Sequence, residues 1–277
     1  MLYLVATPIG NLGDISERAK QTLQSVDLVA CEDTRTSLSL FKLLGIKVKA
    51  TTAYHDHNAA SVYPKLVKKL RAGQNIALVS DAGTPLISDP GYKLVHACRE
   101  QNIPVTTIPG ANAVLSALQL SGLPSNRFFF QGFLPPKAGA KQKVLQELAS
   151  IHATLIIYET ANRLIQTLTD ISNIIGNRQV AVVREITKKF EETKYDNVQD
   201  LILYYTEQGT PKGELVLVID ASPNNQTSDE LDWPMLICSV RPKYSTKKAA
   251  QILSDQTGIS KKEIYQKILE YEKKHQL

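Results

Sequence analysis

Short apolar stretches alternate with amphipathic segments along the first 220 residues, and this alternation restricts the fold more than any other feature of the sequence. The apolar stretches have the length of strands that are buried on both faces, and the segments between them repeat apolar residues at helical spacing. Strands that alternate with helices form a mostly parallel sheet with right-handed crossovers, so we expect an α/β fold. The predicted strands span residues 2–6, 28–31, 76–79, 105–108, 128–133, 154–158, 180–184 and 215–220, and the predicted helices span 16–25, 34–44, 64–72, 91–101, 111–121, 141–150, 162–175 and 198–205.

A break in this pattern divides the chain. Residues 122–126 read Gly-Leu-Pro-Ser-Asn and separate a first α/β domain, residues 1–122, from a second one, residues 123–221. The second domain contains an additional extended segment at 188–194, for which we expect antiparallel pairing. The polar residues 222–234 are typical of a linker, and residues 235–277 form a small tail.

The tail has the pattern of two short helices that are joined at Gly258. Ser245 or Thr246 can cap the first helix, and Ser260 with Glu263 forms a capping box at the start of the second. This arrangement resembles a helix-turn-helix. The residues expected to pack inward are Ala249, Ala250, Ile252, Leu253, Ile264, Tyr265, Ile268 and Leu269.

The net charge of +5 comes entirely from this tail. Residues 241–277 hold nine basic and four acidic side chains, so the residues before them carry no net charge. A basic tail on a neutral body predicts a polyanionic partner. The alternative is a solvated pair of charged helices.

The composition, with 43% hydrophobic and 21% charged residues, is typical of a soluble globular protein. No apolar run approaches the roughly 18 residues of a membrane span, and the run at residues 1–6 is too short for a signal peptide. The three cysteines form no Cys-x-x-Cys pair, which fits a reducing compartment. We therefore expect a cytoplasmic protein with no membrane partner.

Residues 79–91, Val-Ser-Asp-Ala-Gly-Thr-Pro-Leu-Ile-Ser-Asp-Pro-Gly, join a predicted strand to a predicted helix. Open α/β sheets bind their ligands in such loops, beyond the carboxyl ends of the strands. The small residues from Ser80 to Thr84 let a ligand approach the main chain, and Gly83 tolerates a positive φ. Asp81 can accept hydrogen bonds from a ligand hydroxyl. The alternative is a rigid turn in which Asp81 caps the amides of its own loop.

Polar residues occur at the ends of several other predicted strands. They lie at residues 8–14, 31–35, 108–113, 158–160, 183–188 and 212–214. This concentration predicts a cleft between two sheets, and the alternative is ordinary loop polarity. The glycine fingerprints of dinucleotide and nucleoside-triphosphate sites are absent. His55 and His57 have no third histidine nearby, so we predict no metal site.

Together these motifs resemble the tetrapyrrole methylase superfamily, and within it the enzymes that methylate a cytidine ribose 2′-oxygen in 16S rRNA of the small ribosomal subunit. One departure is Thr160-Ala-Asn-Arg163, where the family usually has Ser-Pro-His-Arg. The resemblance implies a two-domain class III methyltransferase fold, S-adenosyl-L-methionine as the methyl donor, and a homodimer. The motifs that carry the resemblance are residues 6–15, 31–35, 57–58, 80–91, 108–110, 132–136, 184–188 and 212–214, and the tail resembles the family's C-terminal helix-turn-helix.

The same resemblance implies the residues of the site. The implied cofactor contacts are Pro8, Asp81, Ala82, Gly83, Thr84, Ile87, Asn112, Ala113, Tyr158 and Glu159, with Arg184 and Glu185 as further candidates. The residues expected to bind RNA are Arg35, Arg163, Arg184, Lys247, Lys248, Lys261 and Lys262, and Lys188 is a further phosphate contact.

The expected reaction is an in-line displacement in which a ribose 2′-oxygen attacks a sulfonium methyl group. A neutral thioether leaves, so the reaction needs no acid, but a base helps a weakly nucleophilic hydroxyl. The candidates for a base are Glu32, Asp33, Glu185 and Lys188, and we select Glu185 as the catalytic residue with Lys188 beside it. Two alternatives remain: a tetrapyrrole or other small-molecule methylase of the same fold, and a non-catalytic rRNA-binding assembly factor.

Overall fold

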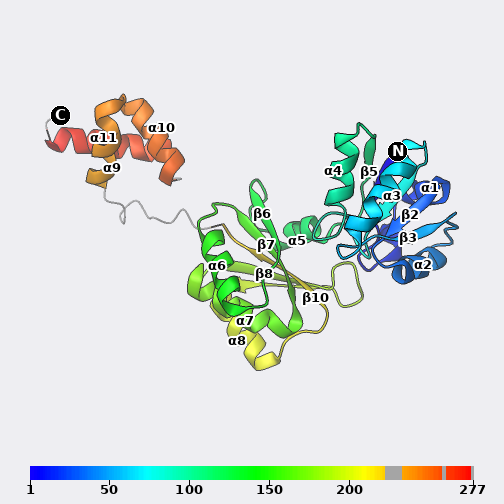
Figure 1. Cartoon of the computed structure of the whole chain (residues 1–277). Coiled ribbons are helices and arrows are strands. Elements are labelled where there is room, and N and C mark those ends of the chain that lie inside the picture. The colour runs from blue at the N-terminus through cyan, green and yellow to red at the C-terminus, as the bar shows by residue number, and fades with distance from the viewer. Residues whose placement is uncertain (222–232, 258–259, 276–277) are drawn as a thin grey trace. The chain divides into compact units, whose positions relative to one another are not determined.

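The computed structural model describes residues 1–221, 233–257 and 260–275, and it contains two compact units, residues 1–220 and 221–277. Each unit is described separately below. In the first unit, Figure 1 shows one half in blue and cyan and a second half in green and yellow, each built around its own sheet. The predicted α/β fold is confirmed.

The sheet of the first half is entirely parallel, with the strand order β3-β2-β4-β1-β5. Helices α1 and α2 pack on one face through residues such as Leu23 and Phe41. Helices α3 and α4 pack on the other face through residues such as Leu66 and Leu94. The elements are β1 Leu2–Val5, α1 Glu17–Ser25, β2 Leu28–Cys31, α2 Thr34–Leu43, β3 Thr51–Ala53, α3 Ala59–Arg71, β4 Ile76–Val79, α4 Tyr92–Glu100 and β5 Val105–Ile108.

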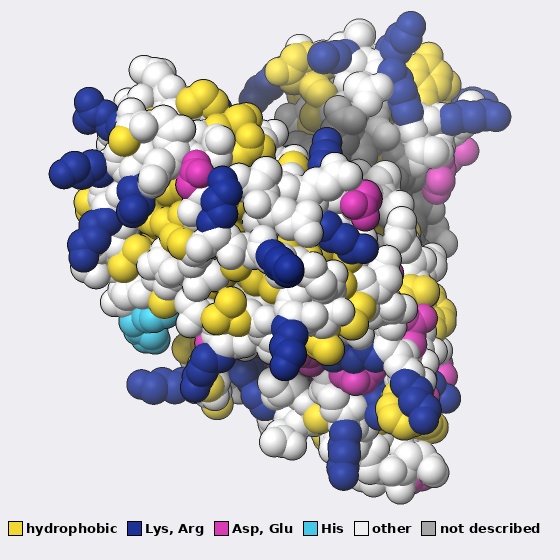
Figure 2. Space-filling view, turned by 90° about the vertical axis from the view of Figure 1, so that its right-hand side faces the viewer, with side chains coloured by type: hydrophobic (Ala, Val, Ile, Leu, Met, Phe, Trp, Pro, Cys, Tyr) yellow, Lys and Arg dark blue, Asp and Glu magenta, His cyan; other side chains and the backbone are white. Residues whose placement is uncertain are grey.

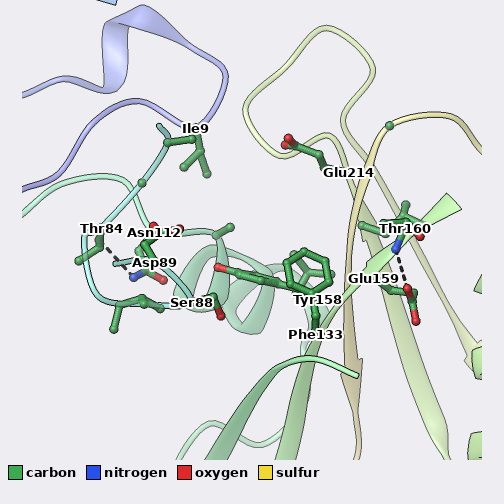
Figure 3. A pocket seen from close by; sticks show the side chains of 17 residues that line it. Ile9, Thr84, Ser88, Asp89, Asn112, Phe133, Tyr158, Glu159, Thr160 and Glu214 are labelled. Carbon is green, nitrogen blue, oxygen red and sulfur yellow. Dashed lines mark hydrogen bonds between the residues drawn. The ribbon is translucent and has the colours of Figure 1, made fainter. Parts of the chain in front are cut away.

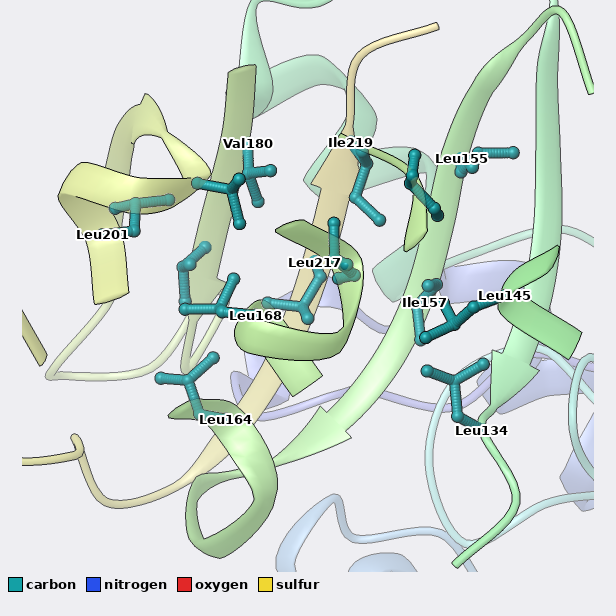
Figure 4. Packing of buried hydrophobic residues seen from close by; sticks show 14 of the residues in the cluster. Leu134, Leu145, Leu155, Ile157, Leu164, Leu168, Val180, Leu201, Leu217 and Ile219 are labelled. Atoms are coloured by element: carbon teal, nitrogen blue, oxygen red, sulfur yellow. The ribbon is translucent and has the colours of Figure 1, made fainter. Parts of the chain in front are cut away.

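The sheet of the second half is mixed, with the order β6-β7-β10-β8-β9. Only β6 and β7 pair in parallel, so the expected antiparallel pairing is confirmed. Figure 4 shows the apolar core between this sheet and helices α6, α7 and α8, with Leu145, Leu168 and Leu201 among its members. The elements are β6 Phe128–Phe133, α6 Ala138–Ala149, β7 Thr154–Thr160, α7 Leu164–Ile174, β8 Gln179–Arg184, β9 Glu192–Asn197, α8 Val198–Gln208 and β10 Glu214–Ile219.

Helix α5, Ala113–Ser121, belongs to the second half by its packing, although the sequence analysis assigned it to the first domain. Val114, Ala117 and Leu118 pack against buried residues of the second sheet, including Ile156 and Val218. The chain therefore passes from one half to the other just before α5 (Figure 1). This crossing places the first turn of α5 at the junction between the halves.

Two local predictions differ from the structure. Helix α3 was predicted to begin at Pro64 but begins at Ala59, because Ala59, Val62 and Tyr63 before the proline pack in the same apolar cluster as the residues after it. The extended segment predicted at 188–194 becomes strand β9 only from Glu192, since residues 186–190 form turns.

The second unit contains helix α9, Trp233–Val240, before the two predicted helices α10, Thr246–Thr257, and α11, Lys261–His275. The sequence analysis missed α9, which contributes Ile237 and Val240 to the small core. Tyr265 and Leu269 were expected to pack inward but are 36% and 39% exposed. Gly258 and residues 222–232 of the expected linker lie outside the described residues.

The expected caps of the tail helices are present. Ser245 Oγ accepts the Lys248 amide at 3.4 Å, and Ser260 Oγ accepts the Glu263 amide at 3.2 Å. The other predicted inward residues pack in this core, with Ile252 only partly buried. Within the residues that the structure describes, no helix has the length and apolar character needed to cross a membrane.

Candidate methyl-transfer site

A cavity of about 250 Å³ lies where the loops of the first half meet the second sheet. Figure 3 shows loop residues of the first half on one side and Tyr158, Phe133 and Glu214 of the second half on the other. Sites for small ligands commonly measure about 300–1,000 Å³, so this cavity lies just below that range. Its lining residues are Ile9, Ala82, Gly83, Thr84, Ile87, Ser88, Asp89, Asn112, Ala113, Phe133, Tyr158, Glu159, Thr160, Gly213, Glu214, Leu215 and Val216.

Two loops of the first half are joined by a pair of main-chain hydrogen bonds beside the cavity. The Thr7 amide donates to the Gly83 carbonyl at 2.9 Å, and the Gly83 amide donates to the Thr7 carbonyl at 3.0 Å. Gly83 has φ +79°, and a Cβ there would lie 3.2 Å from the Ile9 side chain. The glycine therefore keeps bare main chain at the cavity wall.

Asn112 connects this wall to the start of α5. Its Oδ1 accepts the Leu115 amide at 3.1 Å, and its Nδ2 donates to Thr84 Oγ1 at 3.3 Å. Thr84 Oγ1 in turn donates to the Ala111 carbonyl at 3.1 Å. Asn112 thus caps the helix and holds the 80–91 loop, which positions Thr84 and Ala113 in the cavity.

Aromatic side chains form the opposite wall. The Tyr158 ring lies 5.0 Å from the Phe130 ring and 5.4 Å from the Phe133 ring. Burial raises the pKa of the Tyr158 hydroxyl to about 12, and the nearby Asp89 carboxylate contributes to this shift. The hydroxyl consequently stays protonated at neutral pH and can donate a hydrogen bond.

Glu159 lines the cavity, but its carboxylate points away from it (Figure 3). The side chain is fully buried, accepts hydrogen bonds from Thr167 Oγ1 at 2.6 Å and the Thr160 amide at 2.8 Å, and pairs with Arg163. Arg163 also donates to the carbonyls of Leu134 and Pro135. Any ligand contact of Glu159 would therefore involve its main chain. Arg163, which was predicted to bind RNA, instead stabilises the end of β7 through these contacts.

The loop at 185–188, which we call the clasp, lies against Gly213 and Glu214, two residues that line the cavity. Glu185 Oε1 accepts hydrogen bonds from Lys188 Nζ at 2.9 Å and the Glu214 amide at 3.0 Å. Lys188 Nζ also contacts Glu214 Oε2 at 2.8 Å. Hydrogen bonds from the Glu214 amide and from Lys188 lower the pKa of Glu185. The carboxylate that we selected as a base is thus held in its charged form.

The clasp contacts the Pro8–Asp14 turn of the first half. Thr187 Oγ1 donates to Asp14 Oδ2 at 2.6 Å, and the stem of Lys188 lies where a Cβ on Gly10 would be. Gly213 is equally restricted, since a Cβ there would lie 2.6 Å from the Glu185 side chain. These contacts explain why glycines stand at both positions.

Two of the ten implied cofactor residues do not line the cavity. Pro8 is buried, and its neighbour Ile9 lines the wall instead. Asp81 Oδ1 accepts a hydrogen bond from the Asp33 amide at 3.1 Å. Asp81 therefore caps a main-chain amide, as in the alternative interpretation, but this amide belongs to the loop after β2 and not to its own loop. The cavity contains the other eight implied residues.

Sequence reasoning missed Ser88 and Asp89, although both lie within the segment that it singled out. Leu86 and Ser88 have φ values of +74° and +66°. Neither residue type favours positive φ, so this bend of the loop could not be predicted from the sequence. Burial, and then the nearby Glu32 carboxylate, raise the pKa of Asp89 to about 7. Only the folded chain brings these two carboxyl groups together.

The other residues expected to bind RNA differ in their exposure and in whether their charged groups are already paired. Arg184 Nε donates to the Lys212 carbonyl at 2.7 Å, and its guanidinium pairs with Glu192. Arg35 pairs with Asp33, yet its side chain is 90% exposed. In the second unit Lys247, Lys248 and Lys262 are exposed, whereas Lys261 donates to Gln251.

This combination of two α/β halves around a cavity with a bare main-chain wall defines a class of methyltransferase. The profile of the tetrapyrrole (corrin/porphyrin) methylases matches residues 1–202. The chain belongs to this family.

Within the family, the chain matches curated proteins named ribosomal RNA small subunit methyltransferase I. It is 48% identical to the one from Synechocystis sp. over 276 residues, which covers 98% of each chain. It is 46% identical to the one from Mesorhizobium japonicum, covering 97% of this chain and 91% of that protein. It is 44% identical to the one from Haemophilus influenzae, covering 96% of this chain and 95% of that protein.

Solved structures share the fold at low sequence identity. Diphthine synthase matches with a TM-score of 0.61 and 14% identity, covering 79% of this chain and 89% of that one. Uroporphyrin-III C-methyltransferase from Thermus thermophilus, in complex with S-adenosylhomocysteine, matches with a TM-score of 0.52 and 17% identity, covering 78% and 96%. The predicted two-half methylase fold is therefore confirmed.

Proposed function

We propose that this protein uses S-adenosyl-L-methionine to methylate a cytidine ribose 2′-oxygen in 16S rRNA of the small ribosomal subunit. The observation that carries the proposal is its 40–48% identity, over nearly the whole chain, to proteins named for methylating small-subunit rRNA. The solved tetrapyrrole methylases, at 19% identity or less, share the fold alone.

The residues around the cavity fit the proposed methyl donor. Gly83 leaves bare main chain where a Cβ would fill the space, and the aromatic pair Tyr158 and Phe133 offers an apolar surface for a nucleoside. Thr84 and Asn112 supply polar atoms beside the first turn of α5. When bound, S-adenosyl-L-methionine supplies a methyl group on a positively charged sulfur.

The contribution of the chain is to position the two reactants and exclude water. Holding a nucleophile and an electrophile in a near-attack geometry is worth on the order of 7–11 kcal/mol in intramolecular models. The clasp contacts the first half through Thr187 and the stem of Lys188, and these contacts keep the walls of the cleft in place. In this proposal Glu185 and Lys188 act in closure rather than in proton transfer.

The proposed RNA surface includes Arg35 beside the site and the exposed lysines of the second unit. Figure 2 shows Lys and Arg side chains distributed over the face turned to the viewer, with fewer Asp and Glu among them. Phosphate contacts from such side chains produce salt-dependent binding without sequence information. Selection of one cytidine would then depend on the shape of the RNA.

The decisive experiment transfers labelled methyl groups from S-adenosyl-L-methionine to small subunits that lack the modification. We expect labelled 2′-O-methylcytidine in 16S rRNA after digestion, and no label in porphyrinogen substrates. Transfer to porphyrinogen alone would favour the small-molecule methylase. Tight rRNA binding without transfer to any acceptor would favour a non-catalytic assembly factor.

The role of the tail can be tested in the full chain. The double substitution Lys247→Gln with Lys248→Gln should weaken RNA binding and reduce the slope of log affinity against log salt by about 1.5, at roughly 0.7–0.9 per phosphate contact. Lys273→Gln with Lys274→Gln is the matched control, since it removes the same charge from exposed positions of the same unit. Equal effects of both pairs would contradict a specific role for Lys247 and Lys248.

We further propose a cytoplasmic homodimer. The edge strand β6 exposes Phe128 and Phe129 at 43% and 39%, and two such rings at a free sheet edge are typical of a surface that a partner covers. Sedimentation should give twice the 30.6 kDa mass of the chain. A monomer at micromolar concentration would contradict this proposal.

A further inference from the structure

Asp89 is an acidic residue of the cavity wall that is neither an implied cofactor contact nor part of the clasp. It lies in the strained part of the 80–91 loop, between Ser88, with φ +66°, and Gly91, with φ +147°. Positive φ at non-glycine residues is costly, about 1–3 kcal/mol each, and persists where surrounding structure enforces it. Such strain often accompanies a functional site, so the loop has reason to hold Asp89 where it is.

The loop is held in place from both halves of the unit. Gly91 leaves room for the side chains of Leu86 and Leu78, which a Cβ would approach to 2.6 and 2.9 Å. In the second half, Gly132 of β6 leaves room for the Ser88 side chain, because a Cβ on Gly132 would lie 2.9 Å from Ser88 Oγ. The Asp89 carboxyl is therefore fixed next to the junction of the two walls, on the same side as Ser88 in Figure 3.

The groups that face Asp89 come from four strand ends. Glu32 follows β2, Asp56 follows β3 and Asp81 follows β4, while Tyr158 lies on β7 across the cavity. The Ser80 hydroxyl, which donates to the Ala82 carbonyl at 3.2 Å, opposes the effect of these carboxyl groups and lowers the pKa of Asp89. His55 lies near Glu32. The immediate surroundings of Asp89 are thus dominated by carboxyl groups and by burial.

Glu185 has the opposite surroundings. Its carboxylate has two donors within 3.0 Å, one of them a lysine ammonium. A proton accepted by Glu185 would disrupt both of these interactions, whereas a proton accepted by Asp89 would relieve its repulsion with Glu32. The two carboxyl groups therefore differ in their suitability as a base at neutral pH.

We infer that Asp89 is the general base of the methyl transfer, a role that rests on the proposed function. The ribose 2′-oxygen forms a bond to the methyl carbon while the bond from that carbon to sulfur breaks. Sulfur keeps the electron pair and becomes a neutral thioether, and the 2′-hydroxyl proton passes to a carboxylate oxygen of Asp89. The positive charge of the sulfonium and the negative charge of Asp89 are neutralised together, so charge and atoms balance.

The test compares wild type, Asp89→Asn and Glu185→Gln in single-turnover transfer to unmodified small subunits as a function of pH. Without the base, the rate for Asp89→Asn should fall by about 10²–10⁴-fold, while its cofactor dissociation constant, measured by calorimetry, stays near that of wild type. The wild-type rate should rise with pH through a midpoint near 7, where burial and Glu32 place the pKa of Asp89. Glu185→Gln should keep that rise.

A second measurement needs no cofactor. The carboxyl carbon of Asp89, observed by NMR in protein labelled at aspartate and assigned from its loss in Asp89→Asn, should titrate near pH 7. Asp200→Asn serves as the matched control, because Asp200 is exposed and does not line the cavity. It should leave the transfer rate within about threefold of wild type.

Three results would overturn the inference. Asp89→Asn could transfer methyl groups at a rate within tenfold of wild type. It could lose cofactor affinity in parallel with rate, which would make Asp89 a cofactor ligand. The Asp89 carboxyl could titrate near its ordinary value. A wild-type protein that methylates no small-subunit RNA would instead refute the proposed function, and the base role would fail with it.

Discussion

The loop at 80–91 lines the cavity, the loop at 184–188 lies against Gly213 and Glu214 at its edge, and the two loops use similar residues in opposite ways. Both contain acidic residues and two non-glycine residues with positive φ, Leu86 and Ser88 in one and Glu185 and Thr187 in the other. Burial and neighbouring carboxyl groups raise the pKa of Asp89, whereas hydrogen bonds from Lys188 and a main-chain amide lower that of Glu185. The first loop holds a carboxyl that can exchange a proton at neutral pH, and the second holds a charged one that binds Lys188, whose stem packs at Gly10 of the other half.

This difference shows that an acidic residue at a strand end does not by itself indicate a base. What separates the two carboxyl groups is burial beside other carboxylates for Asp89, and hydrogen bonds from a main-chain amide and a lysine for Glu185. The following predictions test that separation, beginning with the largest expected effect.

Gly91→Ala should destabilise the 80–91 loop most. The new methyl group would overlap the side chains of Leu86 and Leu78, which adds about 1–3 kcal/mol of overpacking to about 1–2 kcal/mol of backbone strain. Gly73→Ala is the control, because it also has positive φ but has open space around it. Chemical denaturation should show a larger loss for Gly91→Ala, and equal losses would contradict the tight packing of this loop.

The two carboxyl groups should have opposite effects on the pH dependence of stability. The folded pKa of Asp89, about 7, lies above the ordinary 3.8, so the native state holds a proton that the unfolded chain has released. Wild type should therefore lose stability relative to Asp89→Asn as the pH rises from 4 to 7.

For Glu185 the folded pKa lies below the ordinary 4.5. Its contribution to stability is present above that value and is lost as the pH falls through the folded pKa. The advantage of wild type over Glu185→Gln should accordingly shrink in acid. Denaturation curves from pH 3 to 8 check the direction in which each stability difference changes with pH. If the two variants show parallel pH profiles, the carboxyl groups of the two loops do not have opposite pKa shifts.

Lys188→Met should weaken the clasp by about 1–3 kcal/mol, because Glu185 loses a charged donor while the methionine stem still covers Gly10. Cofactor affinity should fall with it, since the cleft closes less firmly. Lys189→Met is the matched control on an exposed neighbour. If both variants unfold at the same denaturant concentration, the ion pair of Lys188 with Glu185 does not stabilise the clasp.

Thr187→Val should have the smallest effect, about 0.5–1.5 kcal/mol, through the loss of its hydrogen bond to Asp14 across the halves. Valine keeps the branched shape and therefore the same backbone strain. A double-mutant cycle with Asp14→Ala, which removes the acceptor oxygen, isolates this contact, and the two substitutions should be less than additive. Full additivity would show that the contact contributes nothing to closure.

Much of this protein is evident from local sequence pattern. The strands from 76–79 and 105–108 and the polar loops after them were located correctly, because runs of apolar residues and helical periodicity are local properties. The family resemblance came from the order of short motifs, including 80–91 and 184–188. Eight of the ten implied cofactor residues line one cavity, since their loops follow strands whose ends meet at one side of the fold.

Other features depended on contacts between residues far apart in the chain. No local pattern shows that α5 packs on the second sheet, that Arg163 donates its hydrogen bonds to Leu134 and Pro135, or that α9 completes the core of the second unit. The protonation of Asp89 follows from its burial beside Glu32, a residue 57 positions earlier in the chain. Pattern in the sequence determined which elements form, because helix and strand preferences act over a few residues. Tertiary structure alone decided which carboxyl group is paired with a cation, because electrostatic interaction depends on distance in space.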